Sequence, residues 1–283
     1  MKNTTRREFF KEMAKATVQV VAPPVLILAT GPPVKKVVAG PVEKLFNTLF
    51  SREESYDYVP PPNHAYEPSK HDYGYAVNTG VCIGCGRCVN ACKVENHIPM
   101  EKDDTRTWVE RYFITEDREV FVDSPNGGRV GFSPQNEISP LSKFAISRSF
   151  FVPKLCNQCS YPPCVQVCPI GATYKTEDGI ILVDRSRCVG CGYCVQVCPY
   201  GARFIHRKLG VADKCTWCYP RITRGKQPAC VGACPRHARL FGDLHDSLGP
   251  VRDFLRSSDI YVLKEELGTK PKVFYKGYRM GVV

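Results

Sequence analysis

The sequence predicts an α+β fold in which short strands and short helical turns surround groups of cysteines. Three observations support this. The 283-residue chain holds sixteen cysteines, twelve of them within residues 156–234. A nine-residue segment is repeated with a single change, at 164–172 and 194–202. Short β-branched runs lie between the cysteine groups. With 43% hydrophobic residues, the chain can bury a core, which excludes wholesale disorder and a multi-span membrane protein.

The first 40 residues have the features of an export signal. Arg6 and Arg7 are followed by two phenylalanines and a lysine, and a modestly apolar stretch spans 14–30. This pattern predicts a twin-arginine-type signal, or an anchor if it is retained. The alternative is a basic amphipathic helix. Prolines keep the stretch shorter than the roughly 20 residues of a spanning helix. We therefore expect a protein exported to the extracytoplasmic face of the cell membrane, peripheral or anchored by an uncleaved leader.

The remaining chain divides at changes in composition. Residues 41–74 are predicted to form a linker, because prolines, tyrosines and charges occur there without an apolar period. The cysteine-rich domain is expected to cover 75–243, with an insert at 97–152. A C-terminal helix and an extended tail are expected over 244–283.

The sixteen cysteines form four groups of four. Two, two and three residues separate the cysteines of the first and third groups, whereas the middle gap widens to four in the second group and to eleven in the fourth. In chain order the groups are Cys82, Cys85, Cys88 and Cys92; Cys156, Cys159, Cys164 and Cys168; Cys188, Cys191, Cys194 and Cys198; Cys215, Cys218, Cys230 and Cys234. The compact spacing is that of a bacterial ferredoxin, where three cysteines bind one [4Fe–4S] cluster and the fourth binds its neighbour. The sequence therefore predicts four clusters in tandem bacterial-ferredoxin-like dicluster modules.

Three alternatives explain the cysteines less well. Disulfides would be cramped, because four cysteines lie within eleven residues. Structural zinc binds cysteine pairs a dozen or more residues apart, which only the fourth group resembles. Nucleic-acid binding would agree with the net charge of +11, but no recognised module is present. The twin-arginine route carries folded proteins, so the leader and the clusters explain each other.

The basic excess has a second explanation. Residues 156–241 contain twelve basic and four acidic residues, a local charge of +8. The net charge counts the cysteines as neutral. Sixteen thiolates around four oxidised cluster cores would change it by about −8, leaving about +3. The basic residues are therefore interpreted as counter-charge to buried cofactors.

Short elements are predicted between and after the cysteine groups. Asp178-Gly179 is a hairpin signal between two β-branched runs. The insert alternates like a β-hairpin and contains a turn signal, and it is either a docking surface or an inert excursion. The expected strands are 108–115, 119–122, 172–175, 180–183, 202–206 and 239–241, the turn is 125–128, and the helix is 244–257.

On these motifs the sequence resembles the four-cluster iron–sulfur subunits of the dimethyl sulfoxide reductase and polysulfide reductase type, in their exported, twin-arginine-signal branch. The resemblance covers residues 75–275. It includes Lys-Val-Glu-Asn at 93–96 after the first group, Thr-Trp at 216–217 within the fourth, and Leu-Gly-Thr-Lys-Pro at 267–271.

The resemblance implies that each cluster takes ligands from two groups. Cluster 1 would be held by Cys82, Cys85, Cys88 and Cys234; cluster 2 by Cys156, Cys159, Cys164 and Cys198; cluster 3 by Cys188, Cys191, Cys194 and Cys168; cluster 4 by Cys215, Cys218, Cys230 and Cys92. Some relatives replace one ligand and hold a three-iron cluster. None of the sixteen is replaced here, so four [4Fe–4S] clusters are expected.

The implied function is electron transfer within a membrane-associated, quinone-linked respiratory complex. No catalytic site is expected on the chain itself. The implied partners are a polytopic quinone-interacting membrane subunit and a further redox subunit, which could be a molybdenum enzyme, a cytochrome or a heterodisulfide-reductase-like protein. Two alternatives are a freely diffusing exported polyferredoxin and a zinc-dependent nucleic-acid-binding protein.

Two sets of side chains are predicted to act around the clusters. Aromatic residues between the cysteines are interpreted as lids that exclude water: Tyr161, Tyr193 and Trp217. Basic residues near the cysteines either raise reduction potentials or are solvated surface charges: Arg87, Lys93, Arg203 and Lys214.

Overall fold

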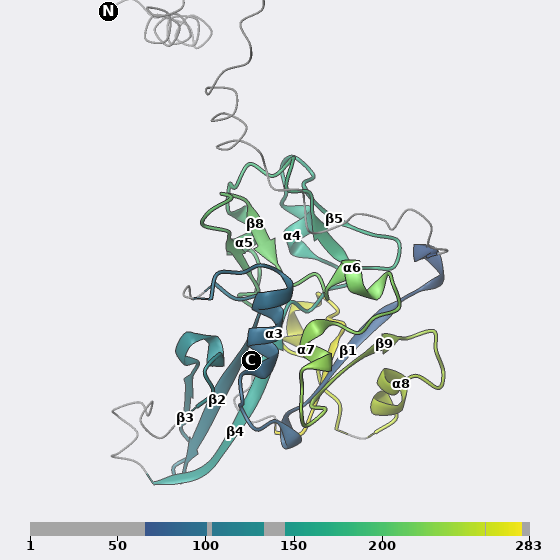
Figure 1. The fold of residues 1–283 in the computed structure, drawn as a ribbon. Helices are drawn as coiled ribbons and strands as arrows, with labels where there is room; N and C mark the ends of the chain where they lie inside the picture. Colours follow the sequence, from purple (N-terminus) through teal and green to yellow (C-terminus); the bar gives the residue numbers. More distant parts are fainter. Residues whose placement is uncertain (1–65, 101–103, 133–144, 258, 279–283) are drawn as a thin grey trace, which may run out of the picture. The chain divides into compact units, whose positions relative to one another are not determined.

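The computed structural model describes residues 66–100, 104–132, 145–257 and 259–278. The predicted leader (1–40) and most of the predicted linker (41–74) lie outside the described residues. The described part combines short helices with four small sheets, as Figure 1 shows. The predicted α+β class and the ferredoxin-like modules agree with this arrangement.

The first sheet joins the two ends of the described residues. Its central strand β1 (Tyr73–Asn78) pairs antiparallel with β9 (Arg239–Asp243) and parallel with β10 (Val273–Lys276). Tyr75 and Tyr275 are fully buried on it. The three aromatic-rich and β-branched segments favour strand geometry because they pack well on a pleated, half-buried surface. The pairing brings the first cysteine group, after β1, beside the fourth group, before β9.

Three helices complete this first module. They are α3 (Arg87–Glu95), α6 (Tyr219–Ile222) and α7 (Ala229–Gly232), and α3 packs against α7. The module is therefore built from two distant parts of the sequence, around the first and fourth cysteine groups.

The second module is nested between the two parts of the first. It contains the hairpin β5–β6 (Thr173–Lys175, Ile181–Val183) and the hairpin β7–β8 (Arg203–Ile205, Ala212–Lys214). The single-turn helices α4 (Pro163–Gln166) and α5 (Tyr193–Gln196) occupy equivalent positions in the repeated segment. The hairpin predicted around Asp178-Gly179 is present, and so is the strand predicted within 202–206.

The insert forms a three-stranded antiparallel sheet. Strand β2 (Thr107–Thr115) lies between β3 (Val120–Asp123) and β4 (Ile146–Leu155). The predicted hairpin is therefore present, and a short 3₁₀ turn occupies the predicted turn at Pro125–Gly128. The sequence did not predict β4. This strand ends one residue before Cys156, so it leads directly into the second cysteine group.

Two expectations for the C-terminal segment were wrong. The helix predicted over 244–257 is only α8 (Pro250–Leu255), because the residue before a proline disfavours helical geometry and Gly249 is extended. The segment after it does not trail away from the domain. The carbonyl group of Lys270 accepts a backbone hydrogen bond from Ser160 at 2.9 Å, and the chain then forms β10.

Nine of the sixteen cysteines are buried, and several of them are part of the apolar core. The main cluster of buried side chains contains Cys88, Cys156, Cys215 and Cys230 together with the aromatic residues of the first sheet. A smaller cluster in the second module contains Cys164 and Cys194. Any group bound by these thiols is therefore part of the packing.

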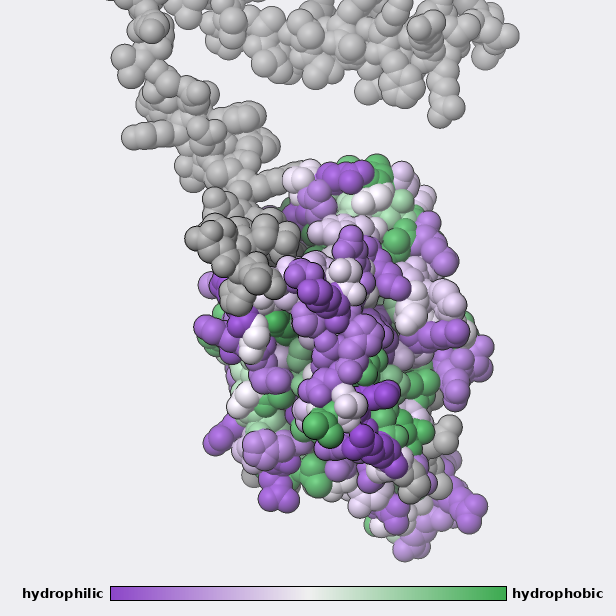
Figure 2. Space-filling view, turned by 90° about the vertical axis from the view of Figure 1, so that its right-hand side faces the viewer, coloured by the Kyte–Doolittle hydropathy of each residue, from purple (hydrophilic) through white to green (hydrophobic). Residues whose placement is uncertain are grey.

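The helices of the described part are short. Within the described ranges, none has the length and apolarity needed to cross a bilayer. The face in Figure 2 carries mostly hydrophilic side chains with apolar ones scattered among them.

Two glycines at equivalent positions provide a test of the packing around α3. Gly86 and Gly192 precede α3 and α5, and both have positive φ. A Cβ on Gly86 would lie 2.3 Å from the carbonyl oxygen of Gly128, whereas nothing lies within 4 Å of a Cβ on Gly192. Gly192→Ala should cost only the backbone strain of about 1–2 kcal/mol. Gly86→Ala should cost clearly more.

The measurement is the temperature at which the visible iron–sulfur absorption is lost on heating. We expect the midpoint of Gly86→Ala to fall well below that of Gly192→Ala. Equal midpoints would show that the insert does not pack against the start of α3 as described.

Candidate iron–sulfur sites

The structure gathers the sixteen cysteines into four sets, each with three members from one sequence group and one from another. Set A and set D each surround a pocket. The thiols of sets B and C lie close enough to raise the pKa values of their own members. Set A is Cys82, Cys85, Cys88 and Cys234; set B is Cys92, Cys215, Cys218 and Cys230; set C is Cys156, Cys159, Cys164 and Cys198; set D is Cys168, Cys188, Cys191 and Cys194.

A repeated local structure divides the second and third groups between two sets. The third cysteine of a group lies on a helical turn, as Cys164 does on α4 and Cys194 on α5. The turn then ends, and the fourth cysteine precedes Pro169 or Pro199, which cannot continue a helix. The fourth thiol is thus carried past its own group to the neighbouring set.

Backbone N–H groups point at the sulfur atoms. Ala238 donates to Cys234 Sγ at 3.3 Å, and Ala212 donates to Cys188 Sγ at 3.4 Å. The amide of Trp217 contacts Cys215 Sγ at 3.4 Å in set B. Hydrogen bonds to sulfur stabilise thiolates and are one of the features that tune iron–sulfur clusters.

Burial works against ionised thiols unless a cation joins them. Burial raises the pKa of Cys82 to about 11 and that of Cys159 to about 12. Neighbouring thiols in the same set raise the pKa further, as Cys156 does for Cys159. All sixteen cysteines are free of disulfides. Four converging thiols of this kind fit a positively charged iron–sulfur core that neutralises them.

The spacing of the thiols is unsuited to a single metal ion. Nowhere in the described ranges do three His, Cys, Asp or Glu side chains converge as they would on one ion. Zinc holds each sulfur at about 2.3 Å, which packs the four sulfurs tightly. In a [4Fe–4S] cube each thiolate binds a different iron, so the sulfurs stand further apart. The sets therefore fit a cluster better than zinc.

Comparison with known proteins identifies the same chemistry. Residues 147–244 match the family model of a 4Fe-4S dicluster domain, and residues 75–95 match that of a 4Fe-4S binding domain. The tetrathionate reductase B subunit of Salmonella typhimurium is 39% identical over 219 residues, which are 77% of this chain and 76% of the relative. The polysulfide reductase B subunit of Wolinella succinogenes is 36% identical over 203 residues, which are 71% of this chain and 92% of the relative.

A third relative is a putative dimethyl sulfoxide reductase iron-sulfur B subunit of Halobacterium salinarum. It is 34% identical over 221 residues, which cover 72% of this chain and 78% of the relative. This protein belongs to the same family of iron–sulfur B subunits. The resemblance to the dimethyl sulfoxide reductase and polysulfide reductase type is thus confirmed, and with it the function of an iron–sulfur electron-transfer subunit. The exported, twin-arginine-signal branch stays a prediction.

Three of the four predicted basic side chains are buried in this B subunit. Lys93, Arg203 and Lys214 are 2%, 4% and 0% exposed, whereas Arg87 is exposed. The interpretation as solvated charges is therefore wrong for the first three and holds for Arg87. A buried positive charge favours the ionised thiolate and the additional electron of a reduced cluster.

Two buried arginines touch the thiol sets directly. Burial acts to lower the pKa of Arg203, but the surrounding thiols, among them Cys164 of set C and Cys194 of set D, together act more strongly in the opposite direction, so its pKa is raised. Arg203 therefore lies between two sets. Arg239 lines the pocket of set A and donates to Thr107 Oγ1 at 2.9 Å. The sequence analysis missed Arg239, although its position five residues after Cys234 was a usable signal.

The three aromatic residues differ in their placement. Trp217 is 1% exposed, and its indole N–H donates to the carbonyl oxygen of Cys156 at 3.2 Å. It therefore fills the space between sets B and C. Tyr161 and Tyr193 are more than half exposed, and Tyr193 lines the pocket of set D. Trp217 excludes water from the interior, whereas the two tyrosines lie at the protein surface.

Arg203 and Arg87 form a matched pair for testing the role of buried charge. Arg203→Gln should lower the potentials of the clusters beside it by on the order of 50 mV, since about 1.4 kcal/mol corresponds to 59 mV for one electron. Arg87→Gln should leave all potentials unchanged, because water and salt screen an exposed charge. Redox titration followed by electron paramagnetic resonance measures both. Equal shifts in the two variants would contradict a specific effect of the buried guanidinium.

Proposed function

We propose that this protein relays single electrons through four [4Fe–4S] clusters in a membrane-associated, quinone-linked respiratory complex. Set A would hold cluster 1, set C cluster 2, set D cluster 3 and set B cluster 4. The sixteen cysteines act only as ligands, and no residue of the chain is assigned to substrate chemistry.

The order of the thiol sets supports the relay. Cys230 of set B raises the pKa of Cys88 of set A, and burial is the larger cause of that shift. Cys156 of set C likewise adds to the effect of burial on the pKa of Cys215 of set B. Arg203 lies between sets C and D. The sets therefore follow one another in the order A, B, C, D.

The exposure of the thiols supports entry and exit at the two ends. Cys85 of set A and Cys191 of set D are exposed, whereas all four thiols of set B are buried. Clusters at A and D could exchange electrons with partner proteins, and those at B and C would pass them through the interior. The proposal rests on this order of sets, with an exposed thiol in each of the two end sets and buried thiols in the middle.

We further propose that the complex lies at the extracytoplasmic face of the membrane. The twin-arginine pattern at Arg6 and Arg7 supports export of the folded, cluster-loaded chain. The relatives are named as parts of reductases, which supports a place in a complex. The partners would be a polytopic quinone-interacting subunit and a molybdenum enzyme, cytochrome or heterodisulfide-reductase-like subunit.

The test of the complex is purification of the tagged full-length chain from native membranes in mild detergent. We expect a polytopic membrane protein and a second redox protein to accompany it in fixed proportion. Recovery of the chain alone in the soluble extracytoplasmic fraction would instead indicate a freely diffusing polyferredoxin.

Pairs of cysteine substitutions test which thiols share a cluster. Cys85→Ser and Cys234→Ser should each remove the cluster of set A, so the double variant should lose no more than either single one. Combining Cys85→Ser with Cys230→Ser should remove two clusters. Iron analysis, at about four irons per cluster, and electron paramagnetic resonance count the clusters. Loss of two clusters in the Cys85/Cys234 variant would contradict the assignment.

A further inference from the structure

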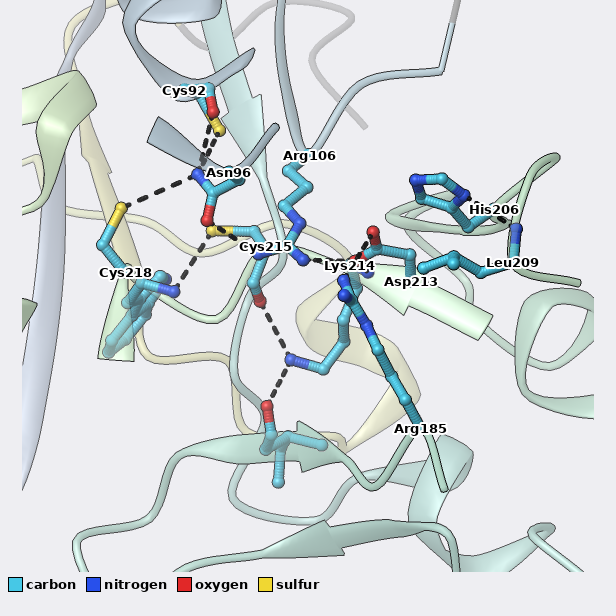
Figure 3. Close-up of polar contacts among 12 residues, drawn as sticks. Cys92, Asn96, Arg106, Arg185, His206, Leu209, Asp213, Lys214, Cys215 and Cys218 are labelled. Carbon is cyan, nitrogen blue, oxygen red and sulfur yellow. Dashed lines mark hydrogen bonds and ion pairs between the residues drawn. The ribbon is translucent and has the colours of Figure 1, made fainter. Parts of the chain in front are cut away.

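The side chain of Asn96 faces two thiols of set B. Asn96 follows the last turn of α3, and its amide nitrogen Nδ2 lies 3.4 Å from Cys92 Sγ and 4.0 Å from Cys218 Sγ, as Figure 3 shows. The same nitrogen donates to the carbonyl oxygen of Cys92 at 2.8 Å. One amide group thus approaches a cysteine from the first sequence group and another from the fourth.

Arg106, together with the carbonyl oxygen of Cys92, determines which end of the amide meets the sulfur atoms. Its Nη1 donates to Asn96 Oδ1 at 2.8 Å. An asparagine amide can be turned over to exchange its oxygen and nitrogen, but a guanidinium can only donate hydrogen bonds. Arg106 therefore holds the oxygen toward itself, and the N–H group is left facing the thiols.

Asp213 holds Arg106 in place. Arg106 Nη2 lies 2.8 Å from Asp213 Oδ1, and both side chains are 2% exposed. Asp213 Oδ1 also accepts the backbone N–H of Lys214 at 2.6 Å, and Arg185 lies 3.4 Å from Oδ2 (Figure 3). Asp213 and Arg185 belong to the second module and Asn96 to the first. The orientation of the amide thus depends on the contact between the modules.

We propose that Asn96 raises the reduction potential of the cluster at set B, and that Arg106 and Asp213 are positioning residues that keep its N–H on the sulfur atoms. This rests on the proposed function, in which set B holds a [4Fe–4S] cluster. Reduction adds negative charge to the cluster and its thiolates. A hydrogen bond to sulfur is therefore stronger in the reduced state and favours it.

The burial of set B explains how this hydrogen bond affects the cluster. All four thiols of set B are buried, and a low-dielectric environment disfavours the more negative, reduced form of a cluster. The Asn96 amide approaches two of these thiols, Cys92 and Cys218. Asn96 thereby offsets part of the effect of burial and keeps this interior cluster reducible by its neighbours.

The main experiment compares Asn96→Asp with the unchanged full-length, cluster-loaded protein. Asp has the same shape and still accepts from Arg106, so folding and iron content should be retained. It replaces the N–H donor with a carboxylate oxygen. In a redox titration followed by electron paramagnetic resonance, the ratio of reduced to oxidised set B cluster at a fixed potential should fall at least tenfold, which is about 59 mV for one electron. The other three potentials should not move.

A matched control separates this effect from added charge. Asn90 lies on the same helix, but its Nδ2 donates to the carbonyl oxygen of Arg129 at 2.8 Å. Asn90→Asp adds the same charge and should leave the set B potential unchanged. The signal of the set B cluster is identified as the one lost in Cys92→Ser.

Variants of Arg106 test the positioning role without altering Asn96. Arg106→Met frees the amide to turn over, so the set B potential should fall and its signal should broaden. Arg106→Lys retains a donor to Oδ1 and should restore much of the potential. If Asn96→Asp fails to assemble the cluster, the titrations of the two Arg106 variants still test whether Asn96 raises the set B potential.

The outcomes distinguish the two proposals. Four assembled clusters with an unchanged set B potential in both Asn96→Asp and Arg106→Met would overturn the role of Asn96 and leave the relay intact. Absence of iron–sulfur clusters from the unchanged protein would overturn the proposed function itself.

Discussion

Mutual repulsion among buried thiolates is the constraint on which the rest of this structure depends. Sets A, B and C bring thiols close together, and burial together with neighbouring thiols raises the pKa values of members such as Cys82 and Cys159. Such a set is stable in its ionised form only around a cation, which an iron–sulfur core supplies. Because the thiols are part of the apolar core, folding and cofactor binding are expected to be linked.

The exchange of the fourth cysteine between sets explains the topology. Each group contributes its fourth thiol to a neighbouring set, so sets must occur in pairs. For sets C and D the partner groups follow each other in the sequence. For sets A and B the two cysteine groups are the first and the fourth, which are far apart in the sequence. The pairing of β1 with β9 brings these two groups together. The second module is nested as a result.

Several basic residues lie in the interior of this protein. Lys93, Arg203, Lys214 and Arg239 are buried, and the last three lie among the cysteines that they neutralise. Their positions agree with the interpretation of these residues as counter-charge to buried cofactors. A single buried aspartate, Asp213, joins Arg106 and Arg185 and ties the insert to the second module.

The sequence by itself determined the cofactor chemistry, the four cysteine groups and the local hairpins, because thiol spacing and turn residues act between near neighbours. It indicated the Asp178-Gly179 hairpin and the strand at 203–205 for the same reason. It misjudged the tail: Pro250 shortens the expected helix, and β10 returns to the first sheet. Only the tertiary structure decided that β4 completes the insert, that Arg239 lies beside set A, and that Arg106 orients Asn96. These contacts join residues far apart in the chain, and their formation depends on packing that no short stretch of sequence encodes.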